Sequence, residues 1–189
     1  DGVWDLSTGV AELMQQGCYA VDDINTRYNK DVLKVLHFTR LIADGEWFAD
    51  KVDKLGVDYD VFAASFYPMW DGTVEDMNTV LSNIATKYNK KVMVAETAYP
   101  YTFVDADGSV NNINDASAMR YSNYDVSLAG QTQSLYEVIK GVSDINNIKS
   151  GYGLGVFYWE PAWLPVGTSD NLENNKVIWE KYGSGWASS

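Results

Sequence analysis

Short apolar runs alternate with amphipathic helical segments along most of this chain, and this alternation restricts the possible folds more than any other feature. Runs that are apolar almost throughout are typical of parallel strands covered on both faces. Four such runs predict strands, at residues 32–38, 59–67, 91–97 and 153–159. The first three begin roughly thirty residues apart, the length of one strand–helix unit. The pattern therefore predicts a parallel α/β sheet.

Helical spacing of apolar residues fills the intervals between these runs. The sequence predicts helices at residues 8–27, 44–55, 73–88, 131–145 and 173–182. Thr73 is expected to cap the third of them, with Asp76 completing an approximate capping box. No segment has the composition of a linker, so residues 1–189 are predicted to form part of one domain.

Two architectures fit a parallel α/β pattern: an open doubly wound sheet and a (β/α)₈ barrel. An open sheet that binds a dinucleotide would carry a glycine-rich phosphate loop after a strand. None of the four predicted strands is followed by such a loop. The sequence therefore favours the barrel.

The charge balance excludes several classes of partner. Asp and Glu number 26 against 14 Lys and Arg, which gives a formal net charge of -12. A strongly acidic surface repels nucleic acids, anionic membranes and polyanionic substrates. A neutral polysaccharide fits better, and 7 Trp and 13 Tyr could stack on sugar rings or fill the core. With one Cys and one His, an intrachain disulfide and a multi-His metal site are both excluded.

Polar or aromatic side chains stand where each predicted strand ends. In a (β/α)₈ barrel the carboxyl ends of all strands meet on one face, where active sites lie. We therefore expect these side chains to converge on one site: His37, Tyr67, Trp70, Glu96, Trp159 and Glu160.

Glu96 is the strongest single candidate, because it directly follows the apolar run at residues 92–95. A carboxylate at the rim of a buried strand can act as a nucleophile or a general acid/base. The alternative is a structural carboxylate paired with a buried Arg or Lys. Glu160 precedes Pro161 in a turn, and a binding or structural role is favoured for it, because a retaining pair needs two carboxyl groups only about 5 Å apart.

Four motifs in order resemble glycoside hydrolase family 53, the arabinogalactan endo-β-1,4-galactanases. They lie at residues 59–68, 94–99, 155–163 and 179–186. The resemblance implies a (β/α)₈ barrel, of which this chain supplies about strands 5 to 8 with their helices. It also implies retaining cleavage of β-1,4-galactan, with Glu96 as the nucleophile. The family's secreted members suggest an extracellular location.

The chain departs from the family pattern at its amino end. The family's acid/base glutamate closes the fourth strand in an Asn-Glu pair, and no such pair precedes residue 8. A complete barrel needs about 250 residues. We therefore expect a half-barrel with two open sheet edges and little or no hydrolase activity by itself, which pairs with an N-terminal half or self-associates.

The resemblance also suggests a role for each aromatic candidate. Trp159 would form the apolar floor beneath the reacting sugar. Tyr67 would hydrogen-bond either Glu96 or the nearby ring, and His37 and Trp70 would line the cleft.

A polar loop contains a second constellation of candidate ligands. Oxygen-bearing side chains alternate around Gly108, at Asp105, Asp107, Ser109 and Asn111. This spacing resembles the front of a calcium loop, although no Glu occupies the twelfth position of an EF-hand. Family members bind calcium here, so a structural Ca²⁺ is expected. The alternative is a solvated loop without metal.

Two rival functions remain open. One is a different retaining β-glycanase of the same clan, acting on glucan or mannan. The other is an inactive carbohydrate-binding fragment.

Overall fold

The computed structural model describes residues 9–104 and 113–159. Within them, four parallel strands form one sheet in the order β1-β2-β3-β4. The strands are β1 (Val35–Phe38), β2 (Val61–Ser65), β3 (Lys91–Thr97) and β4 (Gly153–Tyr158). All four predicted strands are confirmed, although β1 and β2 are shorter than the apolar runs that indicated them.

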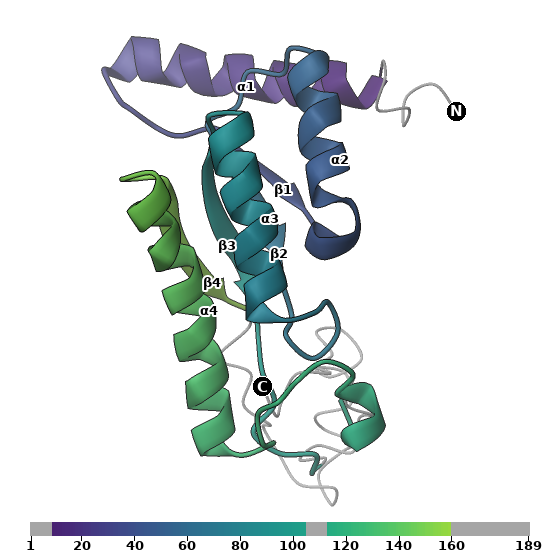
Figure 1. Cartoon of the computed structure of the whole chain (residues 1–189). Coiled ribbons are helices and arrows are strands. Elements are labelled where there is room, and N and C mark those ends of the chain that lie inside the picture. Colours follow the sequence, from purple (N-terminus) through teal and green to yellow (C-terminus); the bar gives the residue numbers. More distant parts are fainter. Residues whose placement is uncertain (1–8, 105–112, 160–189) are drawn as a thin grey trace, which may run out of the picture.

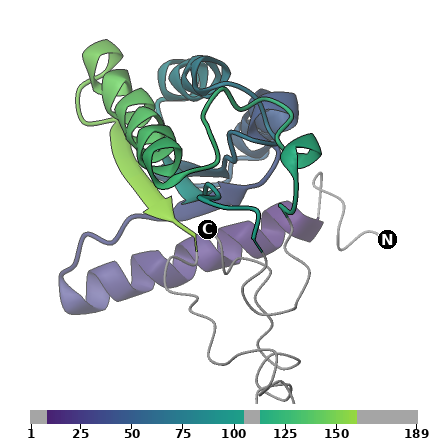
Figure 2. The same cartoon turned by 90° about the horizontal axis from the view of Figure 1, so that it is seen from below.

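Helices follow the strands in alternation, as predicted. They are α1 (Gly9–Tyr28), α2 (Leu41–Lys54), α3 (Val74–Lys87) and α4 (Leu128–Ile148), with a short 3₁₀ turn η1 (Ala116–Ala118) before α4. Figure 1 shows α2, α3 and α4 running along the sheet, whereas α1 crosses near the ends where the strands begin. Viewed from the strand ends, α2, α3 and α4 lie on one side of the sheet (Figure 2). The helix predicted at residues 173–182 lies outside the described residues.

Side-chain caps determine where two of the helices begin. Thr73 caps α3 by accepting a hydrogen bond from the Asp76 N–H, and the Asp76 carboxylate accepts one from the Thr73 N–H. This reciprocal pair confirms the predicted capping box. Ser127 caps α4 by accepting from the Gly130 N–H. That cap starts α4 three residues before its apolar periodicity, which explains why the pattern placed the start too late.

The two faces of the sheet bury different sets of side chains. Phe62, Val92 and Val94 pack with α2, α3 and α4 in the larger core. Alternate residues of the same strands point the other way. They form a smaller buried cluster on what we call the inner face, defined by Val61, Ala63, Met93 and Ala95.

The inner face reaches both edges of the described sheet. Because Leu36 and Val156 pack against the helix-side core, their neighbours Val35 and Phe157 point to the inner face. Val35 is 47% exposed and Phe157 is 64% exposed. Large apolar side chains are thus uncovered at the edge strands β1 and β4, as expected for part of a barrel.

One partly buried lysine attaches α1 to the start of the sheet. The Lys34 ammonium, at the amino end of β1, donates hydrogen bonds to Asp22 on α1 and to Asp58 before β2. Gln15 on α1 also accepts a hydrogen bond from the Asp58 N–H.

None of the helices in the described ranges has the length and apolar character needed to cross a membrane.

Candidate active site

An irregularity between β2 and β3 determines which way Glu96 points. Ala64 pairs with Val94, but the next residue, Ser65, pairs with Glu96, so β3 contains one extra residue at this point. Strict alternation would place Glu96 on the helix side with Val94. The bulge instead brings Glu96 level with Ser65 on the inner face. Bulges commonly re-aim a side chain next to an active site.

Tyr67 holds one oxygen of the Glu96 carboxylate. The Tyr67 hydroxyl donates a hydrogen bond to Glu96 Oε1 at 2.5 Å. The Glu96 side chain is 21% exposed, so it is neither sealed in the core nor fully solvated. Among the described residues, no Lys or Arg forms an ion pair with Glu96, which argues against a purely structural carboxylate.

His37 lies beside the second oxygen of the same carboxylate. Its Nε2 is 3.9 Å from Glu96 Oε2, too far for a hydrogen bond, and 2.8 Å from Ser65 Oγ, within hydrogen-bond range. The sequence analysis did not single out Ser65. A small polar residue within the apolar run at residues 59–67 was the available signal, but only the strand register places its hydroxyl beside His37 and Glu96.

A tight turn after β2 positions the aromatic rings. The Tyr67 and Trp70 ring centroids are 5.3 Å apart with an interplanar angle of 48°. Asp71 Oδ2 accepts a hydrogen bond from the Tyr67 N–H at 2.7 Å. Burial raises the pKa of the Asp71 carboxyl, and the hydrogen bond from Tyr67 opposes that rise. Asp71 therefore fixes the backbone from which Tyr67 reaches Glu96, a contribution that the sequence analysis missed.

Trp159 is tied to the strand that carries Glu96. The backbone N–H of Trp159 donates a hydrogen bond to the carbonyl of Thr97, one residue beyond Glu96, at 2.8 Å. The Trp159 side chain is 39% exposed. Nearby, Gln131 donates to the Tyr99 carbonyl and the Tyr158 hydroxyl, which links the start of α4 to the ends of β3 and β4.

The structure thus brings His37, Tyr67 and Glu96 into direct proximity, with the Trp70 ring tilted against that of Tyr67. Glu160 and the four predicted calcium ligands, Asp105, Asp107, Ser109 and Asn111, lie outside the described residues. Across residues 9–104 and 113–159, no group of three or more His, Cys, Asp or Glu side chains could hold a metal ion.

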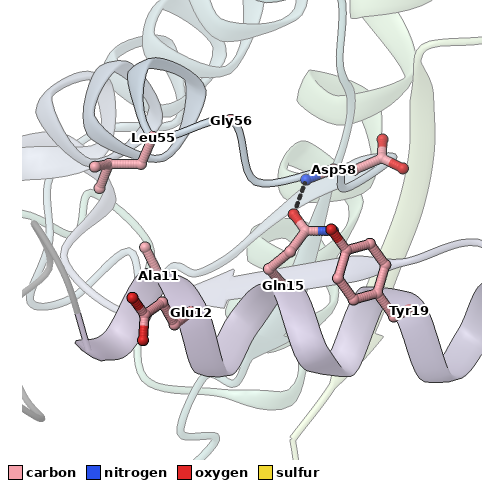
Figure 3. A pocket seen from close by; sticks show the side chains of 7 residues that line it. All are labelled: Ala11, Glu12, Gln15, Tyr19, Leu55, Gly56 and Asp58. Atoms are coloured by element: carbon pink, nitrogen blue, oxygen red, sulfur yellow. Dashed lines mark hydrogen bonds between the residues drawn. The ribbon is translucent and has the colours of Figure 1, made fainter.

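A separate cavity of about 600 Å³ lies between α1 and the turn that follows α2. Figure 3 shows Gln15 and Tyr19 of α1 facing Asp58 across it, with the Asp58 N–H donating to Gln15. Because Asp58 precedes β2, this cavity is at the amino end of the strands. Glu96 is at their carboxyl ends, so the cavity is not part of the candidate active site.

A parallel strand–helix array with a held, partly exposed carboxylate at a strand end is typical of barrel glycosidases. The sequence matches the family described as Glycosyl hydrolase family 53 over residues 4–189. The chain belongs to this family.

Individual relatives agree with the family match. The chain is 44% identical over 184 residues to an endo-beta-1,4-galactanase of Bacillus subtilis, covering 96% of this chain and 41% of that protein. It is 30% identical to an arabinogalactan endo-beta-1,4-galactanase of Cellvibrio japonicus, covering 93% of this chain and 43% of that protein.

A solved structure supports the fold assignment. The Ignisphaera aggregans GH53 catalytic domain superimposes with a TM-score of 0.74 at 32% identity, covering 84% of this chain and 42% of that domain. The four parallel strands therefore match part of a family 53 barrel. This chain spans somewhat under half the length of these relatives.

Proposed function

We propose that this chain supplies the nucleophile of a retaining endo-β-1,4-galactanase and that Glu96 is that nucleophile. The observation that carries the proposal is the asymmetric environment of the Glu96 carboxylate. Tyr67 hydrogen-bonds Oε1, whereas Oε2 accepts no hydrogen bond from the described residues. Galactan is the proposed substrate because the Bacillus and Cellvibrio relatives are named for galactanase activity.

The free oxygen suggests which atom attacks. Glu96 Oε2 attacks the anomeric carbon and the glycosidic C–O bond breaks, which leaves a covalent galactosyl-enzyme. A second carboxylic acid protonates the departing oxygen and then removes a proton from the water that releases the sugar. The Tyr67 hydroxyl orients the carboxylate throughout by donating to Oε1.

The acid/base group is proposed to come from outside this chain. Glu96 is the sole Asp or Glu within the four described strands. By resemblance to family 53, these strands are the fifth to the eighth of the barrel, and the acid/base glutamate closes the fourth. The partner is therefore proposed to be an N-terminal half-barrel.

The remaining strand-end residues are proposed to bind sugar. Trp159 is attached next to Glu96 through Thr97 and is partly exposed, which suits an apolar floor for a sugar ring. His37 and Trp70 line the same site, and Glu160 is proposed to bind substrate.

Because a long polysaccharide does not enter cells, the protein is proposed to act extracellularly.

A structural calcium ion is proposed for the loop at residues 105–111. Its donors are Asp105, Asp107, Ser109 and Asn111, and oxygen donors are the ligands that Ca²⁺ prefers. The ion would stiffen the loop that follows the strand bearing Glu96.

A mechanism-based label tests the nucleophile in this chain directly. A 2-deoxy-2-fluoro-β-galactoside with a dinitrophenolate leaving group needs no acid catalyst, so an absent acid/base glutamate does not prevent reaction. We expect peptide mapping by mass spectrometry to find one galactosyl adduct, on Glu96. The Glu96→Gln variant should remain unlabelled, whereas Glu75→Gln, at an exposed position of α3, should be labelled like the parent. An adduct on another residue, or none in the parent, would refute the proposal.

Substrate class is tested in the complete protein that contains this chain. We expect release of reducing ends from β-1,4-galactan and not from β-glucan or β-mannan. Preference for glucan or mannan would favour a different β-glycanase, and binding of galacto-oligosaccharides without cleavage would favour a carbohydrate-binding fragment.

A further inference from the structure

We infer that Ser65 is a positioning residue that keeps His37 from hydrogen-bonding the attacking oxygen of Glu96. This inference rests on the proposed function and names a residue that the proposal did not use. Ser65 is 4% exposed, it is the last residue of β2, and the bulge in β3 places it directly opposite Glu96.

The distances define a competition for one nitrogen. His37 Nε2 lies 2.8 Å from Ser65 Oγ and 3.9 Å from Glu96 Oε2. If Nε2 carries the proton, its N–H donates to Ser65 Oγ. If it does not, the Ser65 hydroxyl donates to Nε2. In either tautomer Ser65 occupies Nε2, so the imidazole leaves the Oε2 lone pairs free for the sugar.

Removing the hydroxyl would release this restraint. In Ser65→Ala the nearby carboxylate is the one partner that the described residues leave for Nε2, and an N–H···O⁻ hydrogen bond is stronger than a neutral one. That bond would withdraw electron density from the attacking oxygen. Ser65 therefore acts on Glu96 through His37, without touching the sugar itself.

The only histidine in the chain makes the first test direct. With ¹⁵N-labelled histidine, the two ring nitrogens of His37 are the sole imidazole signals. We expect Ser65→Ala to shift the Nε2 signal, Ser65→Thr to restore it because a hydroxyl is kept, and Ser134→Ala, at a buried serine of α4, to leave it unchanged. An unchanged Nε2 signal in Ser65→Ala would overturn the inference.

A second measurement covers the case in which Ser65→Ala does not fold. If Ser65 holds the imidazole, Glu96→Gln in the parent should barely move the His37 ring signals. A large shift would mean that His37 already bonds Glu96, and the inference would be wrong.

The kinetic test separates a positioning role from general damage to the fold. We expect Ser65→Ala to slow fluorosugar labelling of Glu96 by about tenfold, the effect of one charge-assisted hydrogen bond. In a His37→Ala background the same substitution should have little effect, because the competing imidazole is gone. Equal losses in both backgrounds would contradict the inference. Failure of the proposed function would differ, because the parent would then show no adduct on Glu96.

Discussion

At the scale of single residues, the Glu96 carboxylate is divided between two neighbours with different effects. Tyr67 donates to Oε1, and Ser65 keeps His37 away from Oε2. Tyr67 in turn depends on the turn fixed by Asp71 and on the ring of Trp70. For the proposed nucleophile, one neighbour thus orients the carboxylate and the other leaves its second oxygen free.

Removing the Tyr67 hydroxyl should slow the reaction without unfolding the protein. In Tyr67→Phe the ring keeps its packing with Met69 and Trp70, but Oε1 loses its donor. We expect fluorosugar labelling of Glu96 to slow by about ten- to a hundredfold, with the thermal midpoint nearly unchanged. The exposed Tyr136 of α4 provides the control, and a Tyr67→Phe rate equal to that of Tyr136→Phe would argue against the role.

The sequence predicted the residues of the site better than their geometry. Strand-end position was enough to nominate His37, Tyr67 and Glu96. It was not enough to find Ser65, because hydrogen bonding across strands depends on register. Strict alternation even assigns Glu96 to the helix side, and only the bulge corrects this. Register shifts arise from backbone pairing between strands distant in sequence, which one-dimensional periodicity does not encode.

At the scale of the elements, helix type and strand type were predictable, but helix starts depended on caps. The apolar period identified α2, α3 and α4, whereas Ser127 extended α4 toward its amino end. The attachment of α1 was not predictable, because it depends on Lys34 contacting two carboxylates from separate segments. The hydrogen bond that the Lys34 ammonium donates to the Asp58 carboxylate raises the pKa of Lys34 and lowers the pKa of the Asp58 carboxyl.

Lys34→Met should therefore loosen α1 in a pH-dependent way. At neutral pH we expect a loss of about 1 kcal/mol in the free energy of unfolding, since one partner is largely exposed. A carboxyl whose pKa is lowered on folding stabilises above its ordinary pKa and loses that contribution as pH falls through the lowered value. The difference between parent and variant, measured by urea unfolding, should thus shrink below pH 3.8.

The exposed Lys51 of α2, which forms no ion pair within the described ranges, supplies the control for this measurement. Lys51→Met should change stability little at any pH. If the loss of unfolding free energy in Lys34→Met stays constant down to low pH, Lys34 stabilises the protein through packing of its side chain and not through its charge.

At the scale of the whole molecule, apolar surface remains uncovered where a barrel would continue. Ala11 and Cys18 of α1 are buried, but Leu13, Ile24 and Tyr28 on a different side of the same helix are exposed. Val35 and Phe157 are exposed at the two sheet edges. The relatives have more chain than this, since the match covers 41% of the Bacillus protein and 42% of the Ignisphaera domain.

We expect this surface to bind an N-terminal half-barrel. The probe is the part of the Bacillus subtilis endo-beta-1,4-galactanase that this chain leaves unmatched. Light scattering after gel filtration should show a one-to-one complex, and Leu13→Asp should weaken it while Glu12→Gln, at an exposed polar position of α1, should not. Oligomers of this chain alone would indicate self-association instead, and no complex of either kind would refute the proposed surface.

Calcium should raise the thermal midpoint of the chain if the loop at residues 105–111 binds the ion. Differential scanning calorimetry with calcium, with magnesium and with a chelator makes the comparison, because Mg²⁺ prefers a smaller octahedral site. Asp105→Asn together with Asp107→Asn should abolish the response, whereas Glu137→Gln on α4 should preserve it. An unchanged midpoint in the parent would rule out the site.

The extra residue in β3 makes the proposed nucleophile vulnerable to a kind of mutation that alters no side chain near it. An in-frame insertion of one codon between Ala64 and Ser65 would give Ala95 a partner, restore regular pairing between β2 and β3, and turn the glutamate toward the helices. Every amino acid that surrounds the site would still be encoded, yet the carboxylate would be turned away from the sugar. An enzyme built in this way can thus be silenced by an insertion in the neighbouring strand, although a check of each functional residue would find all of them present.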